Sequence, residues 1–79
     1  MVTVHRAFGF RFMIFSNDHE PAHVHVFGQG GEAKLNLTGS HGVVLESAAG
    51  ISRIDARRIV AEMQANKELL LAAWREIHG

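Results

Sequence analysis

The chain has 79 residues, with eight basic and eight acidic side chains, six histidines and no cysteine. This length predicts a single domain over residues 1–79, and a core this small needs good packing or a partner. The absence of cysteine excludes disulfides, thiolate metal sites and a cysteine nucleophile. The zero formal charge argues against a broad basic surface for nucleic acid, but not against a small local one.

Hydropathy along the chain gives no sign of a membrane protein. No apolar run approaches the roughly 20 residues that a transmembrane helix needs. The first residues, from Met1 to Arg6, lack the long apolar core of a signal peptide. We therefore expect a cytoplasmic protein that does not associate with membranes.

Residues 1–49 have the composition of a sheet, rich in glycine, β-branched and aromatic residues. Apolar and polar positions alternate along this part, and an alternation of period two is typical of strands with one buried face. Turn-forming residues separate the alternating runs, and the glycine-rich segment from Gly28 to Gly31 predicts a hairpin. The pattern predicts an antiparallel meander of four to five strands over residues 8–15, 22–27, 32–38 and 43–46, with a short extra strand at residues 3–6.

Residues 50–79 change to alanine, leucine, glutamate and arginine, which favour helices. Ser52 is a candidate N-cap, with Asp55 three residues later as a variant of the capping box. Apolar residues then recur at helical spacing over 54–63 and 69–77. Asn66 lies between these runs, where it can end the first helix and cap a second, which predicts two helices or, as the alternative, one kinked helix. Strands first and helices last indicate an α+β fold, with the helices packed on one face of the sheet.

The densest polar segment, residues 16–25, holds three histidines and two carboxylates. His23 and His25 alternate with valines, so a strand would project both imidazoles to the same side. His19 lies in the loop before them, where Asp18 and Glu20 can either bind a metal ion or orient a histidine. This segment is the main candidate for a functional site.

Three interpretations of the segment remain open. In the first, His19, His23 and His25 bind zinc or another divalent metal and leave one coordination position open for hydrolysis. In the second, no cofactor is present: His23 and His25 act as base and acid in phosphodiester cleavage, while His19 and Asp18 orient them. In the third, the histidines are the solvent face of an amphipathic strand.

Four basic residues are candidates to meet an anionic substrate. Lys34 lies on the strand expected to pair with the histidine strand, and Arg11 lies on the strand before it. The parity of both residues places them on the histidine face. Arg53 and Arg57 are four apart on the expected helix and share one face, where they either contact phosphates or are simply solvated. The remaining histidines, all expected at the surface, are His5, His41 and His78.

The run from Ser16 to Val26 resembles the signature of a small bacterial family, the domain of unknown function 4160. The family pattern is close to Ser-Asn-Asp-His-x-Pro-Pro-His-Val-His-Val, and Ala22 departs from it in place of the second proline. The resemblance covers nearly the whole chain. Its other elements are Gly9-Phe10-Arg11-Phe12, Gly31-Glu32-Ala33-Lys34, the helix start at Gly50, Ser52 and Arg53, and Trp74 before a final Gly79.

The resemblance implies a role that composition does not. Such proteins are commonly encoded beside a small protein of the domain of unknown function 2442 type, in an arrangement that resembles a type II toxin–antitoxin module. We therefore expect the toxin-like member of such a pair, acting on RNA as a ribonuclease-like hydrolase; the alternative is a non-enzymatic protein-binding module. The expected partners are the cognate antitoxin-like protein, RNA and a second copy of the chain.

The resemblance also implies site residues, which are Asn17, Asp18, His19, His23, His25, Glu32 and Lys34. Together with the residue-based candidates, those expected to be catalytic are Asp18, His19, His23, His25 and Lys34, and those expected to bind substrate are Arg11, Asn17, Glu32, Arg53 and Arg57.

Overall fold

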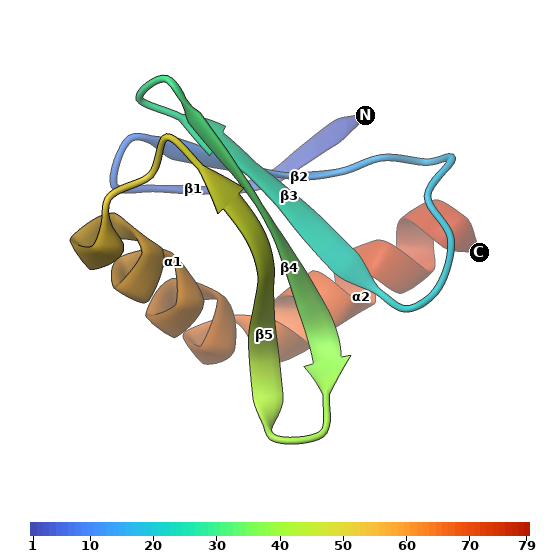
Figure 1. Ribbon diagram of the computed structural model, residues 1–79. Coiled ribbons are helices and arrows are strands. Elements are labelled where there is room, and N and C mark those ends of the chain that lie inside the picture. The colour runs from blue at the N-terminus through green and yellow to red at the C-terminus, as the bar shows by residue number, and fades with distance from the viewer.

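A computed structural model describes residues 1–79 and contains a five-stranded antiparallel sheet followed by two helices (Figure 1). The strands lie in the sheet in chain order, as the predicted meander requires. The α+β fold is therefore confirmed. The strands are β1 (Val2–Ala7), β2 (Phe10–Ile14), β3 (His23–Gly28), β4 (Gly31–Gly39) and β5 (Gly42–Ala49), and the helices are α1 (Arg53–Ala65) and α2 (Lys67–His78).

Two tight hairpins connect β1 to β2 and β3 to β4. The central residues of both turns have positive φ: 56° at Phe8 and 79° at Gly9, then 50° at Gln29 and 78° at Gly30. This geometry suits the right-handed twist of the strands. Phe8 was expected at the start of a strand, but its conformation places it in the turn, so β2 begins at Phe10.

β5 is longer than the alternation predicts. The expected strand over residues 43–46 extends to Ala49 in the structure. The small residues after Glu46 show no alternation, so the sequence pattern does not indicate a strand there, but they pair with β4. Lys34 pairs with Ser47 and Leu35 with Leu45, so Glu46 is an extra residue that interrupts the register. β5 is also an edge strand, with Val44 and Leu45 exposed.

Both helices cover the same face of the sheet (Figure 1). Ser52 Oγ accepts a hydrogen bond from the Asp55 N–H at 3.1 Å, which confirms the predicted N-cap. Asn66 ends α1 as expected, but its side chain does not cap α2 and instead donates to the Glu62 carbonyl at 2.8 Å. No helix is long and apolar enough to cross a membrane.

The core lies between this sheet face and the helices. Alternate residues of β2, β3 and β4 point into it, and four helical side chains close it. No buried side-chain nitrogen or oxygen lacks a hydrogen-bond partner. The buried core residues are Phe10, Phe12, Ile14, Ala22, Val24, Val26, Ala33, Leu35, Leu37, Ile59, Met63, Leu70 and Trp74.

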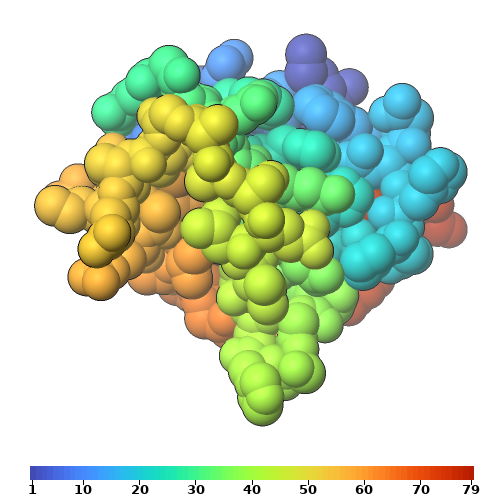
Figure 2. All heavy atoms as spheres, in the orientation of Figure 1, coloured from blue at the N-terminus to red at the C-terminus, as the bar shows by residue number.

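Neither helix lies on the opposite face of the sheet (Figure 1). The β4–β5 hairpin projects from the body of the molecule, at the bottom of Figure 2. The uncovered face is therefore the surface on which the polar residues of β2, β3 and β4 meet solvent.

Candidate functional site

The loop between β2 and β3, residues 15–22, is fastened to the end of α2. Trp74 Nε1 donates a hydrogen bond to Glu20 Oε1 at 3.0 Å. His78 Nε2 lies 3.1 Å from the Phe15 carbonyl oxygen, and the His78 ring stacks on Trp74 with centroids 3.7 Å apart. Because Trp74 is buried in the core, these contacts hold the loop in one position relative to the sheet.

Asp18, in this loop, contacts both histidines of β3. Its Oδ2 atom lies 3.0 Å from His23 Nε2 and 3.1 Å from His25 Nε2. The backbone N–H of Asp18 donates to the Phe15 carbonyl at 3.1 Å, which holds the turn that carries it. His23 is only 7% exposed, and its Nδ1 lies 2.8 Å from the Pro21 carbonyl oxygen. One carboxylate therefore bridges two imidazoles that alternate along a strand.

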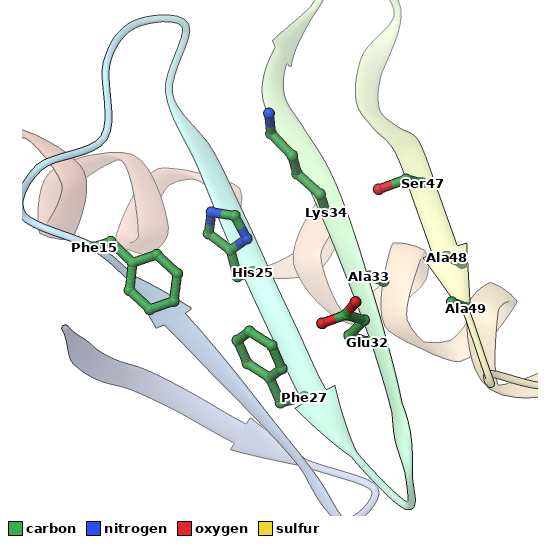
Figure 3. Close-up of a pocket in the computed structure, with 9 residues that line it drawn as sticks. All are labelled: Phe15, His25, Phe27, Glu32, Ala33, Lys34, Ser47, Ala48 and Ala49. Atoms are coloured by element: carbon green, nitrogen blue, oxygen red, sulfur yellow. The ribbon is translucent and has the colours of Figure 1, made fainter.

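His25 also belongs to a group of three aromatic rings on the uncovered face. Its ring stacks on Phe15, with centroids 4.6 Å apart and planes 24° apart. The Phe27 centroid lies 6.3 Å from each of these two rings, with its plane 13° from that of His25. Figure 3 shows the three rings beside one another, with Lys34 and Glu32 across from them on β4. They line a shallow hollow of about 460 Å³, completed by Ala33, Ser47, Ala48 and Ala49.

Lys34 is the cationic side chain of this hollow. It lies directly opposite His25 in the β3–β4 register, where side chains on one face are neighbours. Its Nζ atom is 3.8 Å from Glu46 Oε1, and both side chains are substantially exposed. This contact is long and solvated, so the ammonium group remains available to an anionic ligand.

The structure brings together only part of the predicted site. Asp18, His23 and His25 form one cluster, with Lys34 and Glu32 in the adjoining hollow. The others lie apart: Asn17 and His19 are exposed in the loop and make no side-chain hydrogen bond or ion pair, Arg11 lines a smaller neighbouring hollow, and Arg53 and Arg57 line a groove between β5 and α1.

The structure places Asp18, and not His19, beside His23 and His25, where the metal interpretation expects the third ligand. The group of side chains whose ligand atoms all lie within 4.8 Å of one another is Asp18, His23 and His25. His19 is exposed one residue further along the loop. Sequence position alone does not decide between two adjacent loop residues, because the turn of the loop determines which of them faces the strand.

Two of the histidines expected at the surface are engaged by other side chains. His78 is half-buried between Trp74 and the β2–β3 loop, as described above. His5 is also half-buried, with its Nε2 atom 2.6 Å from Glu62 Oε2. His41 is exposed, as expected.

Phe15 and Phe27 are the residues that sequence reasoning missed at this site. Both have the strand parity of His25, so the period of two places them on the same face. That signal was available in the sequence. Nothing local to residues 15–22 indicated the contacts of Trp74 and His78, since these join positions more than 50 residues apart.

The fold and the cluster define a small α+β protein, in which a five-stranded meander presents an Asp–His–His cluster beside an aromatic hollow. The chain belongs to the family described as a domain of unknown function (DUF4160), whose model matches residues 9–75. This range includes Asp18, His23, His25 and Lys34. No curated protein and no solved structure matches the chain.

Proposed function

We propose that this chain is the toxin-like member of a bacterial toxin–antitoxin pair, and that it cleaves single-stranded RNA in the cytoplasm at the hollow on the uncovered sheet face. The observation that carries the proposal is the position of His25. Asp18 contacts one ring nitrogen, two phenyl rings lie beside the imidazole, and Lys34 lies opposite His25 on β4. This places a proton acceptor, a stacking surface and a cation in one hollow.

The aromatic rings support RNA bases as ligands. Single-stranded nucleic acid is commonly bound by stacking its bases on aromatic side chains of an open sheet. Phe15 and Phe27 are both only partly buried on such a face. Double-stranded RNA would not present free base faces to these rings, so the substrate of this proposal is single-stranded.

The charges near the hollow favour few phosphate contacts. Lys34 and Arg11 are the cations of this face, while Asp18, Glu32 and Glu46 oppose them. Two phosphate contacts correspond to a slope of about −1.4 in log K against log salt for a single strand. We therefore expect RNA binding that weakens only gradually as salt is raised.

The proposed chemistry is a transesterification within the RNA strand. His25 Nδ1, which makes no hydrogen bond in the protein, accepts the proton of a ribose 2′-hydroxyl. The 2′ oxygen then bonds to the adjacent phosphorus, the bond to the 5′ oxygen breaks, and water protonates the leaving oxygen. Lys34 stabilises the charge that develops on the phosphate. His23 acts through Asp18, since its ring is buried and both its nitrogens face protein oxygens.

Expression in a bacterial host tests the proposal. Wild-type protein should arrest growth and, once purified, convert a single-stranded RNA to products ending in a 2′,3′-cyclic phosphate. His25→Gln should abolish both effects, whereas His41→Gln, at an exposed position in the β4–β5 turn, should not. Circular dichroism confirms that the variants fold. Equal growth arrest by a folded His25→Gln variant would remove the histidine cluster from the mechanism.

A toxin-like protein requires a partner that restrains it, and we propose a small protein of the domain of unknown function 2442 type. The exposed edge strand β5, with the adjoining groove lined by Arg53 and Arg57, offers a surface on which such a partner can dock. Co-expression of the neighbouring gene product should restore growth and give a complex by size-exclusion chromatography. Complex formation without any growth arrest by the free chain would favour a binding module instead.

A further inference from the structure

The Asp18–His23–His25 cluster brings hydrogen-bond acceptors together at His23. His23 Nδ1 lies 2.8 Å from the Pro21 carbonyl oxygen, which can only accept a hydrogen bond. The proton of a neutral His23 ring is therefore on Nδ1, and its Nε2 is a lone pair. That lone pair faces the carboxylate oxygen of Asp18 at 3.0 Å, so two acceptors meet.

A positive charge between these atoms resolves the conflict, either as a second proton on His23 or as a metal ion. Three ligand atoms converge rather than two, because His25 Nε2 also lies 3.1 Å from the same Asp18 oxygen. A second proton on His23 would let both rings donate to Asp18, because neutral His25 can also donate from Nε2. A metal ion would instead be bound by all three side chains, and the convergence of two imidazole nitrogens and one carboxylate oxygen points to this alternative.

The distances fit adjacent ligands of one ion. With metal–ligand bonds of about 2.0–2.2 Å, neighbouring donor atoms lie about 3 Å apart at octahedral angles and about 3.4 Å apart at tetrahedral angles. Asp18 Oδ2 lies 3.0 and 3.1 Å from the two imidazole nitrogens, closest to the octahedral spacing. The Pro21 carbonyl on the second nitrogen of His23 is the kind of partner that metal-binding histidines use to fix their tautomer.

We propose that Asp18, His23 and His25 bind one divalent transition-metal ion of the zinc or iron(II) class, with open coordination positions. Two imidazoles and one carboxylate form a donor set that zinc and non-haem iron(II) both accept. Magnesium and calcium prefer sites made only of oxygen, so they are not expected to bind. His25 is part of the lining of the hollow, which places the site next to the proposed RNA position.

This site does not depend on the proposed RNA cleavage, because it follows from the three side chains alone. If both proposals hold, a water molecule on the ion replaces His25 as the proton acceptor. Metal binding is measured without RNA, and RNA cleavage is measured with and without metal. The failure of one proposal is therefore distinguishable from the failure of the other.

The test is a titration of tag-free protein, stripped of metal with a chelator, with Zn²⁺ and Co²⁺. We expect one equivalent to bind by isothermal calorimetry, and visible absorption from bound Co²⁺. Asp18→Asn and His25→Gln should each weaken binding at least about 100-fold, since the loss even of outer-shell partners weakens metal sites 10- to 100-fold. His5→Gln is the matched control, because His5 meets only one carboxylate, Glu62.

His19→Gln decides the identity of the third ligand. Unchanged affinity supports Asp18 in that position, and a loss of affinity would assign it to His19 and overturn the proposed set. Nitrogen-15 NMR of the histidine rings is independent of any variant. Zn²⁺ should shift Nε2 of His23 and His25 while Nδ1 of His23 keeps its proton. Rings that stay unchanged at one equivalent of metal, with His23 carrying two protons, would show that a proton holds the cluster and would overturn the metal site.

Discussion

The two faces of the sheet differ in what they contact, although they share the same strands. On β3, Val24 and Val26 are fully buried against the helices, while His23 and His25, which alternate with them, face Asp18. The covered face is mostly apolar, with His5 of β1 paired to Glu62 of α1, whereas the uncovered face carries charged, titratable and aromatic side chains. Neighbouring residues of one strand therefore have different roles. We expect a substitution on the covered face to change the free energy of unfolding, and a substitution on the uncovered face to change the candidate site.

Trp74 connects the two faces. Its ring is part of the core, yet its indole nitrogen donates to Glu20 in the loop that carries Asp18. The His23 ring lies 5.2 Å from it, centroid to centroid. The position of the site therefore depends on helix α2, whose residues are remote from it in the sequence.

The largest effect is expected on the covered face. Leu70→Ala should lower the free energy of unfolding by about 2–5 kcal/mol, because it removes a fully buried side chain and leaves a cavity. Leu69→Ala, one residue earlier and 58% exposed, is the matched control and should change it by less than about 0.5 kcal/mol. Urea denaturation measures both. Equal losses would mean that α2 does not pack on the sheet through Leu70.

An intermediate effect is expected where the faces join. Trp74→Phe should cost about 1–3 kcal/mol, since it reduces a buried ring and removes the hydrogen bond to Glu20. It should also loosen the β2–β3 loop, visible as faster amide exchange at residues 16–22 and weaker metal binding. Glu20→Gln keeps an acceptor oxygen and should preserve the exchange protection. Unchanged exchange in Trp74→Phe would contradict the role of α2 in fixing the site.

The fold was largely predictable because its signals are local. The alternation in residues 22–27 and 32–38 indicates both strands and their buried sides, and Ser52 and Asn66 mark the helix ends. The errors have local causes as well. The positive φ of Phe8 is unusual for that residue type, and the small residues after Glu46 have no period to detect.

The site was predictable only within the β3–β4 hairpin. The shared parity of His23 and His25 follows from the period of two, and Lys34 joins them through the hairpin register. The choice of Asp18 over His19 depends on the shape of a loop that Trp74 and His78 hold from the far end of the chain. Contacts of that range leave no pattern in the residues nearby, so sequence reasoning placed Arg53 and Arg57 in a site from which they are remote.

A smaller effect is expected at the start of α1, which covers the core but lies away from the site. Ser52→Ala should lower the free energy of unfolding by about 1 kcal/mol, because the hydroxyl no longer accepts from the Asp55 N–H. Ser40→Ala, in the exposed β4–β5 turn, is the control and should be neutral. Thermal denaturation compares the two. Neither should alter metal affinity, and a change in affinity would mean that the two faces are coupled through α1.

The smallest effect on stability is expected on the uncovered face, together with a large effect on function. Lys34→Met should change the free energy of unfolding by less than about 0.5 kcal/mol, since the contact with Glu46 is long and exposed. RNA cleavage should fall at least about 10-fold, because the charge opposite His25 is lost. Lys67→Met, at the start of α2, removes the same charge away from the hollow and should leave cleavage unchanged. A loss of more than about 1 kcal/mol in Lys34→Met would show that this face also supports the fold.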